Sequence, residues 1–135
     1  MKLSRAATYA ISSAAYLANV PAGEIVSNAT ICEAYQMPGK FVLQIMRQLV
    51  TSGIVTSTRG RDGGFQLAKP ANKISLLEII EAVEGRIGAD GEVDFAGLTK
   101  DSKASVEKAL AAIEVDARKR LAAITLADLR AAKAA

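Results

Sequence analysis

The segment GKFVLQIMRQLVTSGIVTSTRGRDGGFQL, residues 39–67, decides the fold. Its first part places apolar residues at a helical spacing of about 3.6 residues, which predicts an amphipathic helix over 39–51. The β-branched run at 54–58 predicts a strand, and 65–67 predicts a return strand. Asp62-Gly63 is a hairpin signal in the loop 59–64 between them. A helix followed at once by a hairpin is therefore expected here.

The two faces of the predicted 39–51 helix differ in chemistry. The apolar face holds Phe41, Val42, Ile45, Met46, Leu49 and Val50. The outer face holds Lys40, Gln44, Arg47 and Gln48. Lys and Arg can hydrogen-bond guanine, and Gln can bond adenine in bidentate fashion. These four residues are predicted to bind DNA, while the alternative reading is an ordinary solvated helix face.

Upstream, two further helices are expected. Apolar spacing predicts one over 3–19, ended by Pro21, and Ser27 is a plausible N-cap for a short helix over 28–36. Pro38 is expected in the first turn of the next helix, where its missing N–H would have no partner. Two short helices in series suggest a helix-turn-helix whose second helix enters the major groove.

The hairpin that follows carries Arg59 and Arg61 between glycines. A narrow minor groove concentrates negative potential and attracts inserted arginine, and glycine permits close backbone approach. Both arginines are therefore predicted to contact DNA, as the basic wing of a winged helix-turn-helix. The alternatives are an ordinary β-turn and, for Arg61, a solvated side chain. A nucleotide-binding loop is not expected, because no Gly-Lys-Ser/Thr follows and no helix is predicted to begin there.

Downstream, Ser75 and Glu78 form a capping-box sequence that predicts a helix over 76–84. Four glycines mark 85–100 as a loop, and the longest helix is expected over 102–123, with a short last helix opened by Thr125. An apolar stripe follows the long helix: Val106, Leu110, Ile113, Ala117, Leu121 and Ile124. The expected domains are a winged helix-turn-helix at 1–84, a loop at 85–100, and a dimerisation helix with a short C-terminal helix at 101–135. The fold class is mainly α with a small β-hairpin wing.

Composition narrows the function. Residues 1–73 carry eight Lys/Arg and three Asp/Glu, a net +5, whereas residues 74–135 carry nine and eleven, a net −2. The first half is the candidate for binding a polyanion. The chain has one cysteine and no histidine, which excludes a zinc site and His-based catalysis, so no enzyme is expected. No apolar run is long enough to span a membrane and the N-terminus is unlike a secretory signal, so a cytoplasmic protein is expected.

Several segments are similar to the Rrf family of bacterial regulators, the BadM/IscR-type group. The matching segments are MKLS (1–4), Tyr9-Ala10, FVLQI (41–45), STRGRDGGFQL (57–67), IIEAVEG (79–85) and ITLADL (124–129). The resemblance implies a winged-helix homodimer in which the long helix, 102–123, crosses to the partner. It also implies a recognition helix at 39–51, a minor-groove arginine at Arg59, and base-proximal residues at Lys40 and Gln44.

The chain departs from many members of that family, which hold an iron–sulfur cluster through three cysteines in the loop that matches 86–100. That loop contains no cysteine here, so no cofactor or metal is expected. Cys32 lies in the first helix of the helix-turn-helix and is interpreted as a packed apolar residue, with a redox sensor as the alternative. Asp90, Glu92 and Asp94 are interpreted as a solvated acidic loop, with a hard-cation site as the alternative.

These observations predict a DNA-binding transcriptional regulator, a repressor, which binds a dyad-symmetric operator in double-stranded DNA as a homodimer. The alternative is a regulator whose DNA binding is gated by an unidentified protein partner or small-molecule effector at the dimer helices. The effector, the operator sequence and the target genes have no signature in the sequence.

Overall fold

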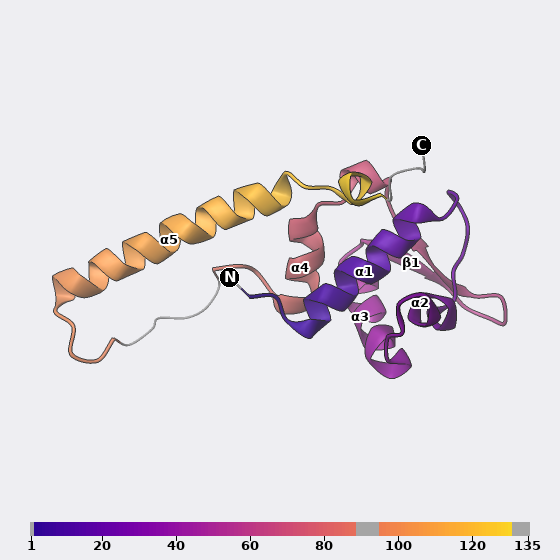
Figure 1. Ribbon diagram of the computed structural model, residues 1–135, viewed down its shortest axis with the longest axis horizontal. Coiled ribbons are helices and arrows are strands. Elements are labelled where there is room, and N and C mark those ends of the chain that lie inside the picture. Colours follow the sequence, from indigo (N-terminus) through magenta and orange to yellow (C-terminus); the bar gives the residue numbers. More distant parts are fainter. Residues whose placement is uncertain (1, 89–94, 131–135) are drawn as a thin grey trace.

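The computed structural model describes residues 2–88 and 95–130 of the chain. Within those ranges the elements are α1 (Arg5–Asn19), α2 (Asn28–Tyr35), α3 (Gly39–Thr51), β1 (Val55–Thr58), β2 (Gly64–Leu67), α4 (Leu76–Glu84) and α5 (Lys100–Ala122), with 3₁₀ turns η1 (Ala71–Lys73) and η2 (Leu126–Leu129). Figure 1 shows helices α1 to α4 and the hairpin in one body, from which α5 projects. This confirms the expected fold class, mainly α with a β-hairpin.

Hydroxyl caps set where four of the helices begin. The side chains of Ser27 and Ser75 accept backbone N–H groups at the starts of α2 and α4, as expected. Ser4 does the same for Ala7, so α1 begins at Arg5 and not at residue 3. Thr99 caps α5, which therefore begins two residues earlier than expected. A cap satisfies N–H groups that have no partner inside the helix, which is why these residues fix the boundaries.

The turn between α2 and α3 differs slightly from the prediction. Gln36 is left-handed, with φ 53° and ψ 48°, and its N–H donates to the Cys32 carbonyl. Helix α2 therefore ends at Tyr35, one residue early. Pro38 is the N-cap of α3 and does not lie in its first turn; its carbonyl accepts the Val42 N–H at 3.0 Å. Its extended φ and ψ redirect the chain into α3.

The core lies between α1, α3, α4 and the hairpin. Ala7, Ala10 and Ala14 of α1 are fully buried, and their small side chains allow α1 to lie close against its neighbours. The largest fully buried side chains are Ile31, Ile45, Met46, Leu49, Ile54, Ile74, Ile79, Ile80 and Leu126. The last of these comes from η2, where Leu126 N–H donates to the Ile74 carbonyl at 3.0 Å. The chain therefore returns to the body after α5.

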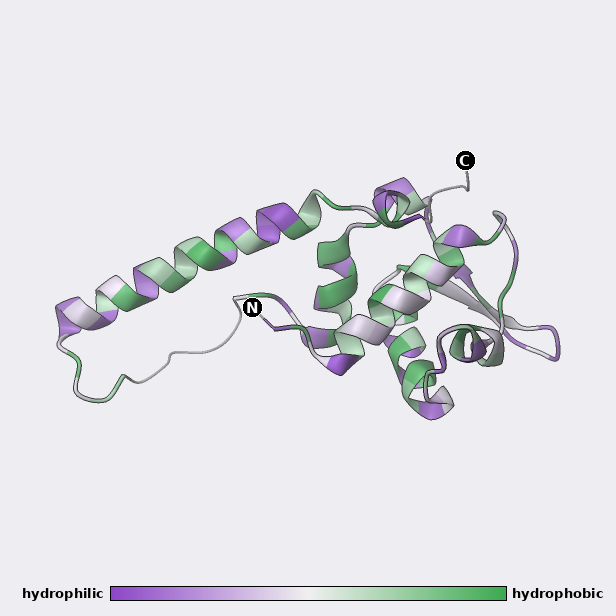
Figure 2. Ribbon diagram, in the orientation of Figure 1, coloured by the Kyte–Doolittle hydropathy of each residue, from purple (hydrophilic) through white to green (hydrophobic). Residues whose placement is uncertain are grey.

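Among the described residues, helix α5 is bonded to the body near its C-terminal end. Arg118 forms an ion pair with Glu81 of α4, and the same Glu81 carboxylate accepts the Ile87 N–H at 2.7 Å. The rest of α5 extends into solvent, and none of its residues is buried. Figure 2 shows hydrophobic residues along this projecting helix.

Candidate nucleic-acid interface

The outer face of α3 presents the predicted base-reading residues. Lys40, Gln44, Arg47 and Gln48 are all exposed. At about 100° per residue they fall within an arc of roughly 100° around the helix axis. Helix α3 thus brings these four side chains together on a single face, of a size that a major groove admits.

The opposite face of α3 holds the helix in place. Val42, Ile45, Met46 and Leu49 are each at most 1% exposed. Phe41, at the margin of this face, stacks edge-on against Tyr9 of α1 with ring centroids 5.4 Å apart. Burying these side chains fixes the rotation of α3 about its axis, and that rotation determines which residues point outward.

The hairpin begins almost at once after α3. The Ile54 N–H donates to the Leu49 carbonyl at 3.0 Å, which places β1 directly against the end of the helix. Strands β1 and β2 pair antiparallel, with Thr58 opposite Gly64. Strand β2 therefore starts one residue before the prediction, and β1 one residue after it.

A five-residue turn, 59–63, carries both predicted wing arginines. The Gly63 N–H donates to the Gly60 carbonyl at 3.0 Å, so Arg61 and Asp62 are the central residues of a β-turn. Arg59 and Arg61 are both exposed. Figure 1 shows this turn at the end of the body remote from α5.

The base of the wing is anchored to the segment that enters α2. Val26 and Phe65 exchange two backbone hydrogen bonds, at 2.9 and 2.8 Å. A β-carbon on Gly64 would lie 2.3 Å from the Val26 carbonyl oxygen, so the two backbones meet without room for a side chain. The glycine expected to allow approach to DNA thus also allows approach to the protein's own backbone, which ties the wing to the helix-turn-helix.

The six predicted contact residues are available for an external partner. Within residues 2–88 and 95–130, no side-chain hydrogen bond or ion pair engages Lys40, Gln44, Arg47, Gln48, Arg59 or Arg61. Four of them are cationic, and they occupy two adjacent elements. Unpaired cations and amides gathered on an exposed surface suit contacts with phosphates and base edges.

A polar cleft beside the wing brings Arg61 together with hydroxyl groups and with the carboxylates of Glu24 and Asp62. It has a volume of about 380 Å³ and lies between the wing turn and the start of α2. Ser27, Thr30 and Tyr16 line it together with Arg61. No local pattern signals this grouping, because the wing turn lies more than thirty residues along the chain from Thr30.

Cys32 and the acidic residues of the predicted loop after α4 are the other candidates for redox or metal chemistry. Cys32 is 8% exposed, and burial together with the nearby Glu33 carboxylate raises the pKa of its thiol. A raised thiol pKa keeps the residue in its unreactive protonated form, which agrees with a packed apolar role. Asp90, Glu92 and Asp94 lie outside the described residues. Among the residues that are described, no helix is long and apolar enough to cross a membrane.

Comparison with known proteins matches the chain to one family along most of its length. Residues 3–132 match the Rrf2 family model, described as "Iron-dependent Transcriptional regulator". A protein named as an HTH-type transcriptional regulator, Rv1287 of Mycobacterium tuberculosis, is 28% identical over 130 residues, which cover 96% of this chain and 81% of that protein.

Solved structures of two other regulators superpose on most of this chain. CymR, the global cysteine regulator of B. subtilis, superposes with a TM-score of 0.79 at 26% identity, covering 96% of this chain and 95% of that one. IscR of T. potens superposes with a TM-score of 0.69 at 28% identity, covering 96% and 85%.

Proposed function

This chain belongs to the Rrf2 family of transcriptional regulators, and we propose that it binds a dyad-symmetric operator in double-stranded DNA as a homodimer and represses transcription. The observation that carries this proposal is the unpaired, exposed face of α3 beside the exposed arginines of the wing. In this arrangement Lys40, Gln44, Arg47 and Gln48 read the major groove, and Arg59 with Arg61 meets the flanking minor groove or its phosphates.

The apolar stripe of α5 supports the proposed dimer. Ala117 and Leu121 are partly covered by the body, but Leu110 and Ile113 on the same stripe remain 45% and 63% exposed. An uncovered apolar stripe on a projecting helix favours packing against a second copy. Two copies would place two α3 helices in successive major grooves, about one helical turn of DNA apart.

We infer that this regulator works without an iron–sulfur cluster, although the family description names iron. Cluster ligation needs several thiolates or imidazoles, and these 135 residues hold one cysteine and no histidine. Cys32 is buried within α2 and packs in the core. An absorption spectrum of anaerobically purified protein should lack cluster bands, and their presence would refute this inference.

The proposed DNA binding is tested by selecting binding sites from random duplexes and then measuring the affinity of the protein for the selected sequence. A palindromic site is expected, with affinity that falls steeply as salt rises because phosphate contacts release counterions. Arg59→Ala should weaken binding by about tenfold or more and relax sequence preference beneath the wing. Lys119→Ala, on the far-off exposed surface of α5, is the matched control. Arg59→Ala protein that binds and selects like the wild type would contradict the wing's role.

The sign of regulation needs its own measurement. A reporter gene driven by a promoter that overlaps the selected site should give less transcript when the protein is present in vitro. More transcript would make the protein an activator and would leave the DNA-binding proposal intact.

A further inference from the structure

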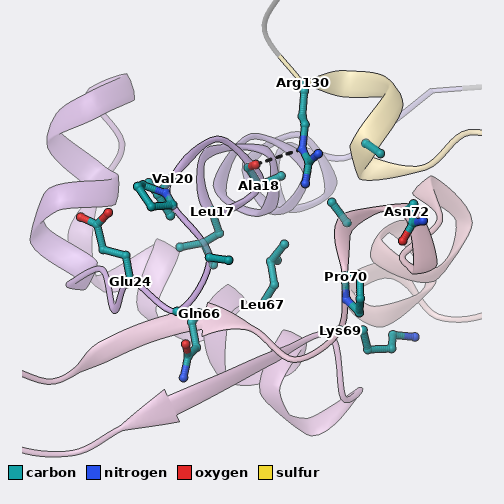
Figure 3. Close-up of a pocket in the computed structure, with 15 residues that line it drawn as sticks. Leu17, Ala18, Val20, Glu24, Gln66, Leu67, Lys69, Pro70, Asn72 and Arg130 are labelled. Carbon is teal, nitrogen blue, oxygen red and sulfur yellow. Dashed lines mark hydrogen bonds between the residues drawn. The ribbon is translucent and has the colours of Figure 1, made fainter.

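A cavity of about 670 Å³ opens on the body beside the base of the wing. It lies between the end of α1, the loop to α2, strand β2, η1 and η2, and Figure 3 shows its lining. Leu17, Val20, Leu67, Pro70 and Ala71 form apolar walls. A volume of this size falls in the range of about 300–1,000 Å³ that small-molecule sites occupy.

One cationic side chain, that of the exposed residue Arg130, lies at the rim of this cavity. The Nε–H of Arg130 donates to the Ala18 carbonyl at 3.3 Å, and this single bond anchors the side chain. A guanidinium has five N–H donors, and no other bond or ion pair engages this one within the described part of the chain. Figure 3 shows the guanidinium facing the cavity above Leu67. It therefore offers unpaired donors, in the planar arrangement that binds a carboxylate.

The other charges at the cavity restrict the ligand further. The Lys69 ammonium is paired with Glu78 at 3.0 Å, so the charge of Lys69 is largely compensated within the protein. Glu24 lies on the opposite side of Leu17 from Arg130 in Figure 3. A second acidic group on the ligand would be repelled there. The lining thus suits a molecule with one carboxylate and an apolar body.

We propose that this cavity binds a small aliphatic monocarboxylic acid, with its carboxylate on Arg130 and its chain against Leu17 and Leu67. The site is separate from α5, where the dimer is proposed. It joins the two parts of the protein that face DNA: Leu67 belongs to the wing strand, and Glu24 belongs to the loop that enters α2 through Val26.

Occupancy would act on DNA binding through that junction, a consequence that rests on the proposed function. The wing and the helix-turn-helix meet where Phe65 pairs with Val26. Phe65 is one residue from Gln66 of the cavity lining, and Val26 is two residues from Glu24 of the same lining. A ligand wedged beside Leu67 shifts affinity only if it binds one wing position better than another. We expect it to lower operator affinity by tilting the wing away from α3.

The binding step is tested with hexanoate and with hexanamide, its neutral counterpart of equal shape. Amide spectra (¹H–¹⁵N) of the full chain should show hexanoate shifting Leu67 and Ala71, with hexanamide binding at least about tenfold more weakly. Arg130→Gln should remove that difference, and Lys119→Gln, which loses the same charge on α5, should preserve it. Equal binding of the two probes to the wild type, or no shift at these amides, would overturn the proposal even if Arg130→Gln failed to fold.

The regulatory step is measured separately, by anisotropy of the selected operator with and without saturating hexanoate at constant ionic strength. Weaker DNA binding with hexanoate supports the coupling. If the spectra show an occupied cavity but operator affinity is unchanged, the coupling to DNA binding is refuted, while the proposed ligand site still stands. Failure to bind DNA even without hexanoate would refute the proposed function instead.

Discussion

Gly64 shows, at the scale of a residue, how the wing depends on one missing side chain. A β-carbon there would lie 2.3 Å from the Val26 carbonyl oxygen, well inside van der Waals contact with backbone that cannot rotate away. Gly64→Ala must therefore push β2 away from the segment that enters α2, where Phe65 and Val26 exchange hydrogen bonds. We expect a loss of about 2–4 kcal/mol in the free energy of unfolding, measured by urea denaturation.

Gly39→Ala is the matched control for that experiment. Nothing lies within 4 Å of a β-carbon at Gly39, which begins helix α3 with an ordinary φ. Alanine favours helix over glycine, so this variant should be neutral or slightly stabilising. Equal destabilisation by both substitutions would show that crowding against Val26 is not the cause.

Ser13 is a buried hydroxyl in the middle of α1. It is fully buried, and its Oγ has no hydrogen-bond partner within the described residues. An unsatisfied buried hydroxyl costs about 1–3 kcal/mol, so Ser13→Ala should stabilise the protein and raise Tm by a few degrees. Ser12→Ala, at the half-buried neighbour, changes helix propensity equally and is the control. A gain no larger than that control would contradict the explanation.

At the scale of an element, the start of α4 combines a cap with a charge. Ser75 and Glu78 cap each other's backbone N–H groups, and Lys69 pairs with the Glu78 carboxylate. Burial acts to raise the pKa of Glu78, but the hydrogen bonds from Ser75 and Lys69 outweigh it, so this pKa lies below its ordinary value. Ionised Glu78 therefore favours the folded state.

The pH dependence of stability follows from that direction. The contribution of Glu78 is complete above its unfolded pKa of about 4.3 and is lost as pH falls through the lower folded value. Glu78→Gln keeps a capping side chain but cannot titrate, so its Tm should fall less steeply than the wild type's below about pH 5. Glu107→Gln, which removes an exposed i,i+4 pair with Lys103, is the control. Parallel Tm profiles for wild type and Glu78→Gln would contradict the assignment.

At the scale of the whole molecule, α5 decides whether the body acts alone. Ile113 and Val115 have similar exposure, 63% and 67%, but face opposite sides of the helix because two residues turn it by about 200°. Ile113 lies on the same apolar stripe as Ala117 and Leu121, which are partly covered. We expect Ile113→Glu to give a monomer with unchanged helix content, measured by light scattering and circular dichroism. Val115→Glu should remain a dimer; a dimer in both variants would contradict this interface.

Much of the DNA-facing surface could be predicted from local patterns. The helical spacing of apolar residues along α3 predicted that Arg47 and Gln48 lie on the outer face and that Ile45 and Leu49 lie on the inner face. The structure confirms this, because the first two are exposed and the last two are buried. Ser27 and Ser75 marked helix starts because a cap acts within three residues of its own position. The predicted helix starts at residues 3 and 102 were wrong, because the caps at Ser4 and Thr99, and not the apolar spacing, set where α1 and α5 begin.

The amino-acid order by itself determined the helix periods, the caps and the turn of the hairpin, together with which side chains of α3 and the wing are charged. These are local properties, set by dihedral preferences and by hydrogen bonds over a few residues. Only the tertiary structure decided that Gly64 meets Val26, that Leu126 returns to the core, and that Arg130 anchors at Ala18 beside a cavity. Those contacts join residues separated by up to 112 positions, and they exist because buried apolar faces must pack together, which no local pattern encodes.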